Sequence, residues 1–190
     1  MNLSALLPAL RALPEYADLR DRAGRASVAL GLPRAARLPF VAALTADLNR
    51  PALLITARSD RALVFNDELS AWLPLIADHR SLSTVHLFPE PNPLPYEHAP
   101  WGPRTIRARL ATLSAIVNRP ASIVVSCARA LLTGTLPKRD FSAAARMLRV
   151  GQSIRLDKLL DSWTGAGYAN ETIVAEPGQF SRRGGIVDVW

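Results

Sequence analysis

The sequence predicts an α/β fold, in which a module built on a parallel sheet is followed by a small α+β module. Short apolar runs of strand length alternate with helical patterns through most of the 190-residue chain. Near-continuous apolarity is typical of parallel strands that are covered on both faces. Beyond Pro137, several strand patterns surround a single helix pattern. We therefore expect two domains, at residues 1–145 and 146–190.

The elements of the first module follow one another along the chain. Leucines at helical spacing predict an amphipathic helix over residues 3–13, and the absence of a basic start argues against a secretory signal. Apolar runs predict four strands, at residues 28–32, 52–56, 84–88 and 122–126. Helical patterns predict three further helices, at residues 38–48, 61–75 and 104–117. This alternation is typical of a right-handed parallel layer.

The segment 89–103 interrupts this alternation. Six of its residues are prolines, which exclude both a helix and a central strand. We expect Tyr96 and Trp101 to hold this loop against the body of the protein. A ligand for a proline-recognition domain is the alternative interpretation.

The second module is predicted to open with a strand at residues 147–153 and a helix at 155–163, which stops at the glycines of 165–167. Further strands are predicted, with a turn at Pro177-Gly178; they cover residues 171–175, 179–183 and 185–190. Because the sequence stops at Trp190 within a strand pattern, we expect this module to be truncated.

The charge balance permits a polyanion partner without requiring one. The chain has 23 basic and 16 acidic residues, a net charge of +7, and only Lys138 and Lys158 are lysines. The densest basic cluster is Arg104, Arg107 and Arg109, which makes a nucleic-acid-binding module the alternative function. The other arginines are spread along the chain, which is typical of a solvated surface.

Composition also narrows the chemistry. A single cysteine excludes a disulfide framework and a multi-cysteine zinc site, and the three histidines are too scattered to suggest a metal site. No apolar run approaches the roughly 18 residues that a membrane helix needs. We therefore expect no metal, no cofactor, no membrane association and a cytoplasmic location.

The segment from Gly31 to Leu38 occupies the place of a phosphate-binding loop, between an expected strand and an expected helix. A working loop reads G-x-x-x-x-G-K-[ST], in which the lysine contacts phosphate and the hydroxyl holds magnesium. Here Ala36, Arg37 and Leu38 replace the second glycine, the lysine and the hydroxyl residue. Arg34 and Arg37 beside a helix N-terminus leave anion binding open, but an ordinary, non-functional loop is the favoured interpretation.

An NTPase of this class also needs an acidic residue at the end of a later strand. The strand at 122–126 instead runs into Cys127-Ala-Arg-Ala, without Asp or Glu. Cys127 itself is typical of a small buried hydrophobe rather than of a nucleophile. The sequence therefore predicts no ATP hydrolysis and no catalytic residue.

The most distinctive stretch, residues 177–190, predicts strands that carry adjacent arginines. Alternation places Phe180 and Arg182 on one face and Ser181 and Arg183 on the other. One arginine is then presented to solvent beside glycine backbone, where a guanidinium suits bidentate recognition of a partner's carboxylate. A surface strand with two solubilising arginines is the alternative, which the pattern alone favours.

Several blocks of the chain resemble one known family. They are Phe88-Pro-Glu90, Leu94-Pro-Tyr-Glu97, Arg109 to Leu113, Arg149 to Leu160, Ala166-Gly-Tyr168 and Pro177 to Val189. In this order they resemble the N-terminal, UvrB-homology module of the bacterial transcription-repair coupling factors, over residues 31–190. That module is similar to UvrB, the helicase of excision repair, without its ATPase motifs. The resemblance therefore implies a degenerate helicase-like first module.

The resemblance implies a non-catalytic scaffold of transcription-coupled nucleotide excision repair, which recruits the excision-repair protein UvrA to stalled RNA polymerase. By motif position it implies Arg183 as the residue that contacts UvrA, with Arg182 and Phe180 as supporting protein-binding residues. Translocation on DNA and contacts with RNA polymerase are implied for other domains of a larger protein.

Overall fold

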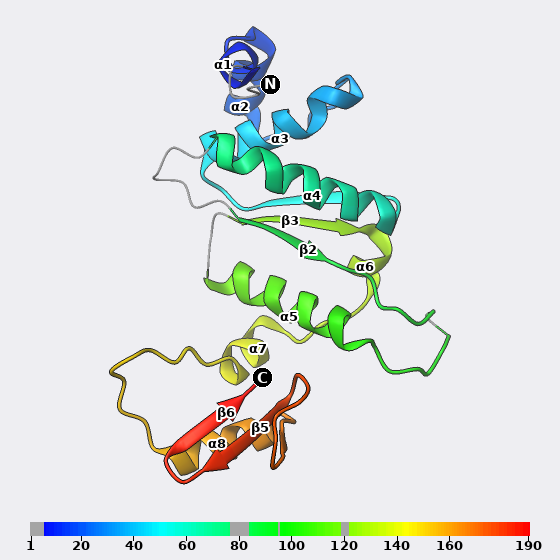
Figure 1. Cartoon of the computed structure of the whole chain (residues 1–190). Coiled ribbons are helices and arrows are strands. Elements are labelled where there is room, and N and C mark those ends of the chain that lie inside the picture. Colours follow the sequence, from blue (N-terminus) through cyan, green and yellow to red (C-terminus); the bar gives the residue numbers. More distant parts are fainter. Residues whose placement is uncertain (1–5, 77–83, 95, 119–121) are drawn as a thin grey trace. The chain divides into compact units, whose positions relative to one another are not determined.

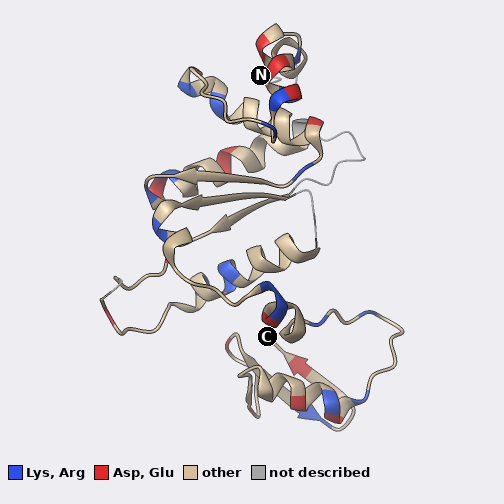
Figure 2. Ribbon diagram, turned by 180° about the vertical axis from the view of Figure 1, so that it is seen from behind, with Lys and Arg blue, Asp and Glu red and all other residues tan. Residues whose placement is uncertain are grey.

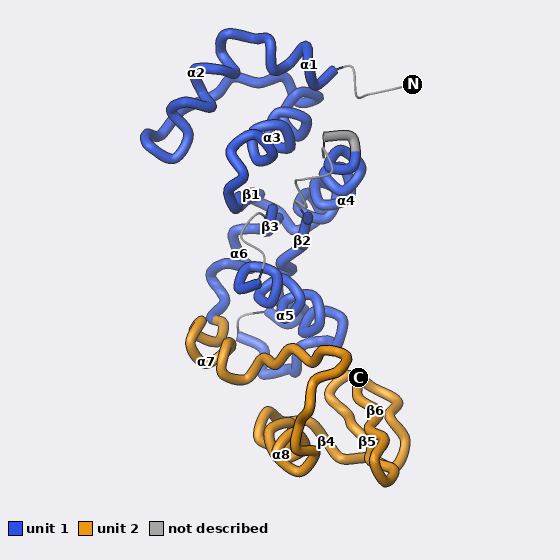
Figure 3. The backbone as a smooth tube through the Cα atoms, turned by 90° about the vertical axis from the view of Figure 1, so that its left-hand side faces the viewer, with its two compact units in different colours: residues 1–134 blue, residues 135–190 orange. Residues whose placement is uncertain are grey.

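The computed structural model describes residues 6–76, 84–94, 96–118 and 122–190. The chain divides into two compact units, residues 1–134 and 135–190 (Figure 3). This division precedes the boundary expected at residue 145, so that the short helix α7 (Lys138–Ala144) belongs to the second unit.

A three-stranded parallel sheet forms the centre of the first unit (Figure 1), as the apolar runs predict. Its strands are β1 (Ala52–Thr56), β2 (Thr84–Phe88) and β3 (Ser122–Cys127), in the order β1-β3-β2. The central strand β3 pairs with both neighbours, and Val125 lies beside Leu54 and Leu87. All of its residues are buried, which explains why this run contains no charged side chain.

Helices cover both faces of the sheet. The chain passes from β1 over β3 to β2 and then returns to β3, so right-handed connections place the two intervening helices on opposite faces. These helices are α4 (Ser59–Ile76) and α5 (Pro103–Asn118) (Figure 1). The expected helices at 61–75 and 104–117 are thereby confirmed.

A further layer of helices packs on α4. The helix α3 (Arg34–Leu48) contacts α4, and α1 (Leu6–Arg11) and α2 (Pro14–Arg22) contact α3. The expected N-terminal helix thus ends at Arg11, and a new helix starts with Pro14, a residue suited to a first helical position. The expected start of the N-terminal helix, at residues 3–5, lies outside the described residues.

The strand expected at residues 28–32 is wrong. Residues 27–33, all of which are described, contain no helix or strand, and α3 begins directly after them. Val28 and Leu32 nevertheless pack against the core from this irregular segment. The need to cover the core, rather than strand pairing, explains why the run is apolar.

Arg109 is a buried cation on α5, with only 3% of its surface exposed. Its guanidinium donates to the carbonyl of Pro89 at 2.8 Å and also to the carbonyls of Thr133 (3.3 Å) and Ala130 (3.4 Å). Burial lowers the pKa of this guanidinium, but an arginine remains charged in proteins. Arg109 therefore ties α5 to the segments that follow β2 and β3.

The same guanidinium holds the proline-rich segment through aromatic contacts. It lies 3.9 Å from the centroid of the Phe88 ring and 4.9 Å from that of Trp101. The segment contains no helix or strand in its described residues before Pro103, as expected. Trp101 packs as expected, whereas Tyr96 is exposed and does not pin the loop.

Tyr16 joins α2 to α3. Its hydroxyl donates to Asp47 at 2.7 Å, and the same carboxylate accepts two hydrogen bonds from Arg11, at 2.6 and 3.1 Å. The Tyr16 ring meets Phe40 edge-on, with centroids 5.2 Å apart. Burial, and then the hydrogen bond to Asp47, raise the pKa of the Tyr16 phenol.

Besides α7, the second unit contains a longer helix and a small sheet. They are α8 (Leu156–Gly165) and the strands β4 (Ala169–Asn170), β5 (Gln179–Arg183) and β6 (Ile186–Val189). The order is β4-β5-β6, in which β5 runs parallel to β4 and antiparallel to β6. The helix at 155–163 and the last two strands are confirmed as expected.

Two expectations for this unit are wrong. No strand forms at residues 147–153, and the strand expected at 171–175 is replaced by the shorter β4, which comes earlier. The turn after α8 accounts for the second difference. Gly167 adopts a φ of 92°, and the Tyr168 amide donates back to the carbonyl of Trp163 at 2.9 Å, which sends the chain directly into β4.

Replacing Arg109 with Met is expected to lower the free energy of unfolding by roughly 3 kcal/mol, because three carbonyls lose a charged donor. Urea denaturation followed by circular dichroism measures this loss. Arg107→Met, at an exposed position of the same helix, is the control and should change the value by less than about 0.5 kcal/mol. Equal losses in the two variants would contradict the structural role of Arg109.

Tyr16→Phe is expected to flatten the dependence of stability on alkaline pH. Since folding raises this pKa, the contribution of Tyr16 is complete below its unfolded value of about 10 and declines as the pH rises toward the folded value. The variant lacks this titration, so its free energy of unfolding should fall less between about pH 9 and pH 11. Parallel curves for the two proteins would show that Tyr16 titrates alike when folded and unfolded.

Candidate protein-binding site

The candidate site lies on the hairpin formed by β5 and β6. Gly184 and Gly185 alone connect the two strands, and Gly184 has a φ of 64°. A positive φ at only the first of two turn residues is the pattern of a type II′ turn, which matches the twist of paired strands. Arg182 reinforces this turn, since its Nε donates to the carbonyl of Gly184 at 3.0 Å.

One face of the hairpin, which we call the inner face, packs on α8. It carries Phe180, Arg182, Val187 and Val189, because residues paired across antiparallel strands share a face. Phe180 is only 2% exposed, and its ring lies 5.7 Å from that of Trp163 on α8. Phe180 therefore anchors the hairpin to α8 and is not available to touch a partner directly.

The opposite face, the outer face, carries Ser181, Arg183, Ile186 and Asp188. Arg183 Nη2 donates to Asp188 Oδ2, while 71% of the arginine side chain and 45% of the aspartate side chain stay exposed. Ile186 beside them is 65% exposed. Ser181 is buried, and its hydroxyl donates to the carbonyl of Thr172 at 3.0 Å.

The structure thus brings Arg182, Arg183 and Phe180 into one hairpin but divides them between its faces. Only Arg183 lies on the outer face, where it is paired and accessible. Sequence reasoning did not single out Ile186 and Asp188 as companions of Arg183. The sequence did contain the information needed to find them. A two-residue turn fixes which residues of the second strand lie opposite those of the first, and therefore which residues share a face.

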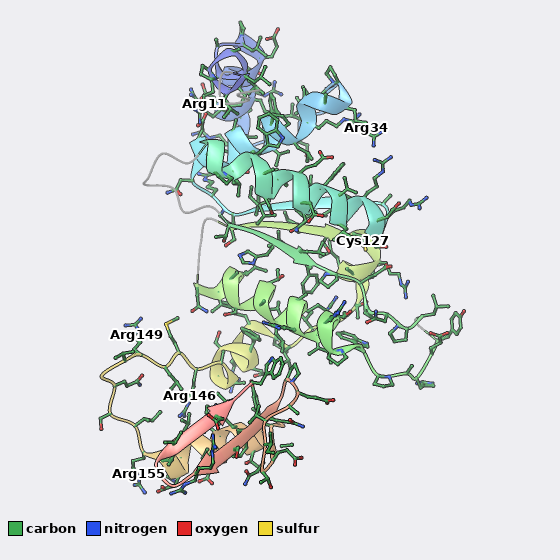
Figure 4. All side chains as sticks on the ribbon, viewed as in Figure 1. Arg11, Arg34, Cys127, Arg146, Arg149 and Arg155 are labelled. Atoms are coloured by element: carbon green, nitrogen blue, oxygen red, sulfur yellow. The ribbon has the colours of Figure 1, made fainter. Side chains whose placement is uncertain are left out.

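The degenerate loop from Gly31 to Leu38 has no site geometry of its own. Arg34 and Leu38 belong to the first turns of α3, and the Leu38 side chain is buried in the core. Arg37 Nε donates to the carbonyl of Leu32 at 3.2 Å. Arg34 is exposed at the first residue of α3 (Figure 4). Ala36, in the same turn, adds no polar side chain.

At the end of β3 the structure places a carboxylate that comes from a distant part of the sequence. Glu90, from the proline-rich segment, lies 3.6 Å from Cys127 Sγ and 3.7 Å from an Arg129 guanidinium nitrogen. Glu90 and Cys127 border a pocket of about 340 Å³ at the carboxyl ends of β2 and β3. Among its lining residues, Thr105 donates to Asn92 Oδ1 at 2.7 Å.

The lysines and arginines of the described residues are not confined to one element. Figure 2 shows them spread over helices, strands and loops of both units. The cluster expected from sequence is divided, because Arg104 and Arg107 are exposed whereas Arg109 is buried. Within the described residues, no group of His, Cys, Asp and Glu could hold a metal ion, and no helix is long and apolar enough to cross a membrane.

Arginines also line the segment that joins α7 to α8. Figure 4 labels Arg146, Arg149 and Arg155 along it, and all three are exposed. Arg155 is paired with Asp157 at 3.3 Å. This exposed pair resembles that of Arg183 and Asp188 but lies outside the hairpin, so it offers a matched reference for the candidate site.

Comparison with known proteins places the hairpin in a described domain. Residues 147–190 match the family of the UvrB interaction domain. This match includes α8 and all three strands of the second unit, and it therefore contains both faces of the hairpin.

Similarity to whole proteins extends through both units. The transcription-repair-coupling factor of Bacillus subtilis (strain 168) is 31% identical over 160 residues, which cover 84% of this chain and 13% of that protein. Those of Staphylococcus aureus strains MRSA252 and USA300 are each 27% identical over 176 residues, covering 92% of this chain and 14% of theirs. The resemblance seen in the sequence is thereby confirmed, and the chain spans about one seventh of the length of these relatives.

Gly184→Ala is expected to destabilise the second unit by about 1 kcal/mol, because alanine is strained at a φ of 64°. Gly185→Ala is the matched control, since no atom lies within 4 Å of either added Cβ and Gly185 lacks a positive φ. Denaturation followed by tryptophan fluorescence, which includes Trp163, compares the two variants. A loss in Gly185→Ala as large as that in Gly184→Ala would contradict the turn assignment.

Proposed function

We propose that this chain, a relative of the transcription-repair-coupling factors over most of its length, is a protein-interaction module of transcription-coupled nucleotide excision repair. Its second unit binds the excision-repair protein UvrA, and Arg183 is the principal contact. Within a larger DNA translocase, such binding brings UvrA to stalled RNA polymerase. DNA and RNA polymerase are then partners of other domains.

The observation that carries this proposal is the accessible Arg183 within a matched interaction domain. Its guanidinium is mostly exposed and sits at the end of a strand that Phe180 anchors to α8. A guanidinium on rigid backbone suits bidentate recognition of a carboxylate, because little conformational freedom is lost on binding. Arg182 contributes by stabilising the turn beside it.

Further features support a non-catalytic role for the first unit. The position of the magnesium-binding hydroxyl is filled by Leu38, whose side chain belongs to the core. A carboxylate beside the end of β3, that of Glu90, is engaged by Arg129. We propose that the first unit is a helicase-like scaffold that has lost nucleotide chemistry. Sustained ATP hydrolysis by the purified chain would count against this part of the proposal.

A nucleic-acid-binding module of a repair helicase is the competing function. It draws on the net charge of +7 and on the cluster at Arg104 and Arg107. The burial of Arg109 removes one phosphate contact from that cluster, and the remaining charges are dispersed. Weak binding to any polyanion is expected from the charge alone, so only steeply salt-dependent, high-affinity DNA binding favours this alternative.

Titration calorimetry with purified UvrA tests the proposal. We expect the wild-type chain to bind and Arg183→Ala to lose about 1–3 kcal/mol of binding free energy, as is typical for a charge-assisted contact. Arg155→Ala is the control, because it removes another exposed, ion-paired arginine of the same unit. It should bind like the wild type.

Two outcomes would overturn this assignment. A folded wild-type chain that does not bind UvrA would reject the proposed partner. Equal losses in Arg183→Ala and Arg155→Ala would show that general charge, rather than the hairpin, governs binding. Repeating the titration at higher salt distinguishes a specific contact of Arg183 from an effect of general charge, because salt screens the effect of general charge.

A further inference from the structure

The two faces of the β5–β6 hairpin differ in what they can offer a partner. The inner face packs on α8 through Phe180, and Arg182 on that face is engaged with the turn carbonyl. On the outer face, Arg183, Ile186 and Asp188 stand together and remain accessible. A partner that contacts Arg183 therefore also meets Ile186 and Asp188.

We propose that the outer face is the docking surface, with Ile186 as its apolar anchor and Asp188 as the residue that positions Arg183 and selects the partner. This inference rests on the proposed function and extends it from one arginine to a three-residue surface. The matching surface on UvrA carries a carboxylate for Arg183, a hydrogen-bond donor for Asp188 and an apolar hollow for Ile186.

The partner must supply an interacting group for each of the two charges, those of Arg183 and Asp188. In the free chain the pair is largely hydrated, and an exposed pair of this kind contributes at most about 1 kcal/mol to stability. Docking removes water from both groups, which is unfavourable unless each gains a partner. A carboxylate alone would satisfy Arg183 and place two negative groups around it. A donor facing Asp188 completes the network.

Ile186 supplies the apolar part of this surface. It lies directly opposite Arg183 in the strand pairing and is mostly exposed. An apolar side chain that excludes water strengthens a neighbouring charged contact, which is why binding energy concentrates where both occur together. Because β6 is joined to β5 by only two residues, Ile186 and Arg183 are held in fixed relation.

Binding of face-specific variants to UvrA tests the inference. Asp188→Asn and Ile186→Thr are the outer-face variants, and threonine keeps the β-branched shape that suits a strand. We expect each to weaken binding at least fivefold. Arg155→Ala, which removes an exposed, ion-paired arginine outside the hairpin, is the matched control and should change affinity less than twofold. Circular dichroism and thermal melting establish that each variant folds.

The outcomes separate this inference from the function on which it rests. If the wild type binds and Arg183→Ala is weaker, but Asp188→Asn and Ile186→Thr bind like the wild type, the docking surface is wrong and the proposed function stands. Tighter binding by Asp188→Asn would also overturn the inference, because Asp188 would then merely compete for Arg183. No binding by the wild type would reject both.

A double-mutant cycle gives a second measure that does not depend on Ile186→Thr folding. If Asp188 positions Arg183, their effects are coupled. The loss in affinity of Arg183→Ala combined with Asp188→Asn should then be smaller than the product of the two single losses. A loss equal to that product would show independent roles and overturn the positioning of Arg183 by Asp188.

Discussion

The buried guanidinium of Arg109 is the interaction on which the architecture of the first unit depends. It joins α5 to the carbonyls that follow β2 and β3, and it lies against the rings of Phe88 and Trp101. In parallel α/β proteins, ligands usually bind beyond the carboxyl ends of the strands. Here much of that edge is stabilised by contacts of the chain with itself.

The sequence predicted the parallel sheet because strands that are both paired and buried consist of short runs of apolar residues. β3 is buried throughout and lacks charge, so its run was unambiguous. The run at 28–32 is similarly apolar and uncharged, and the segment 147–153 begins with apolar residues, but neither forms a strand. Val28 and Leu32 cover the core from an irregular segment, and pattern alone does not distinguish this from pairing. The sequence analysis grouped Arg104, Arg107 and Arg109 as one basic cluster. On α5, however, Arg109 is buried whereas Arg104 and Arg107 are exposed.

Part of the candidate site could be predicted from the sequence, because the hairpin depends on residues that are close together in the chain. A Gly-Gly turn between alternating strands specified the hairpin and placed Arg182 and Arg183 on opposite faces. Which face was covered depended on α8, whose Trp163 packs on Phe180, and that contact was not visible in the sequence. The two arginines differ in their contacts: Arg182 donates to the turn carbonyl of Gly184, and Arg183 on the opposite face pairs with Asp188 and stays largely exposed.

Hydrogen exchange measured with and without purified UvrA tests the central claim most directly, because it reports every part of the chain at once. The account predicts slower exchange in residues 179–189 when UvrA is present. It also predicts unchanged exchange in the proline-rich segment and in α5. Protection confined to the first unit, with the hairpin unaffected, would contradict the claim that the hairpin is the site of docking.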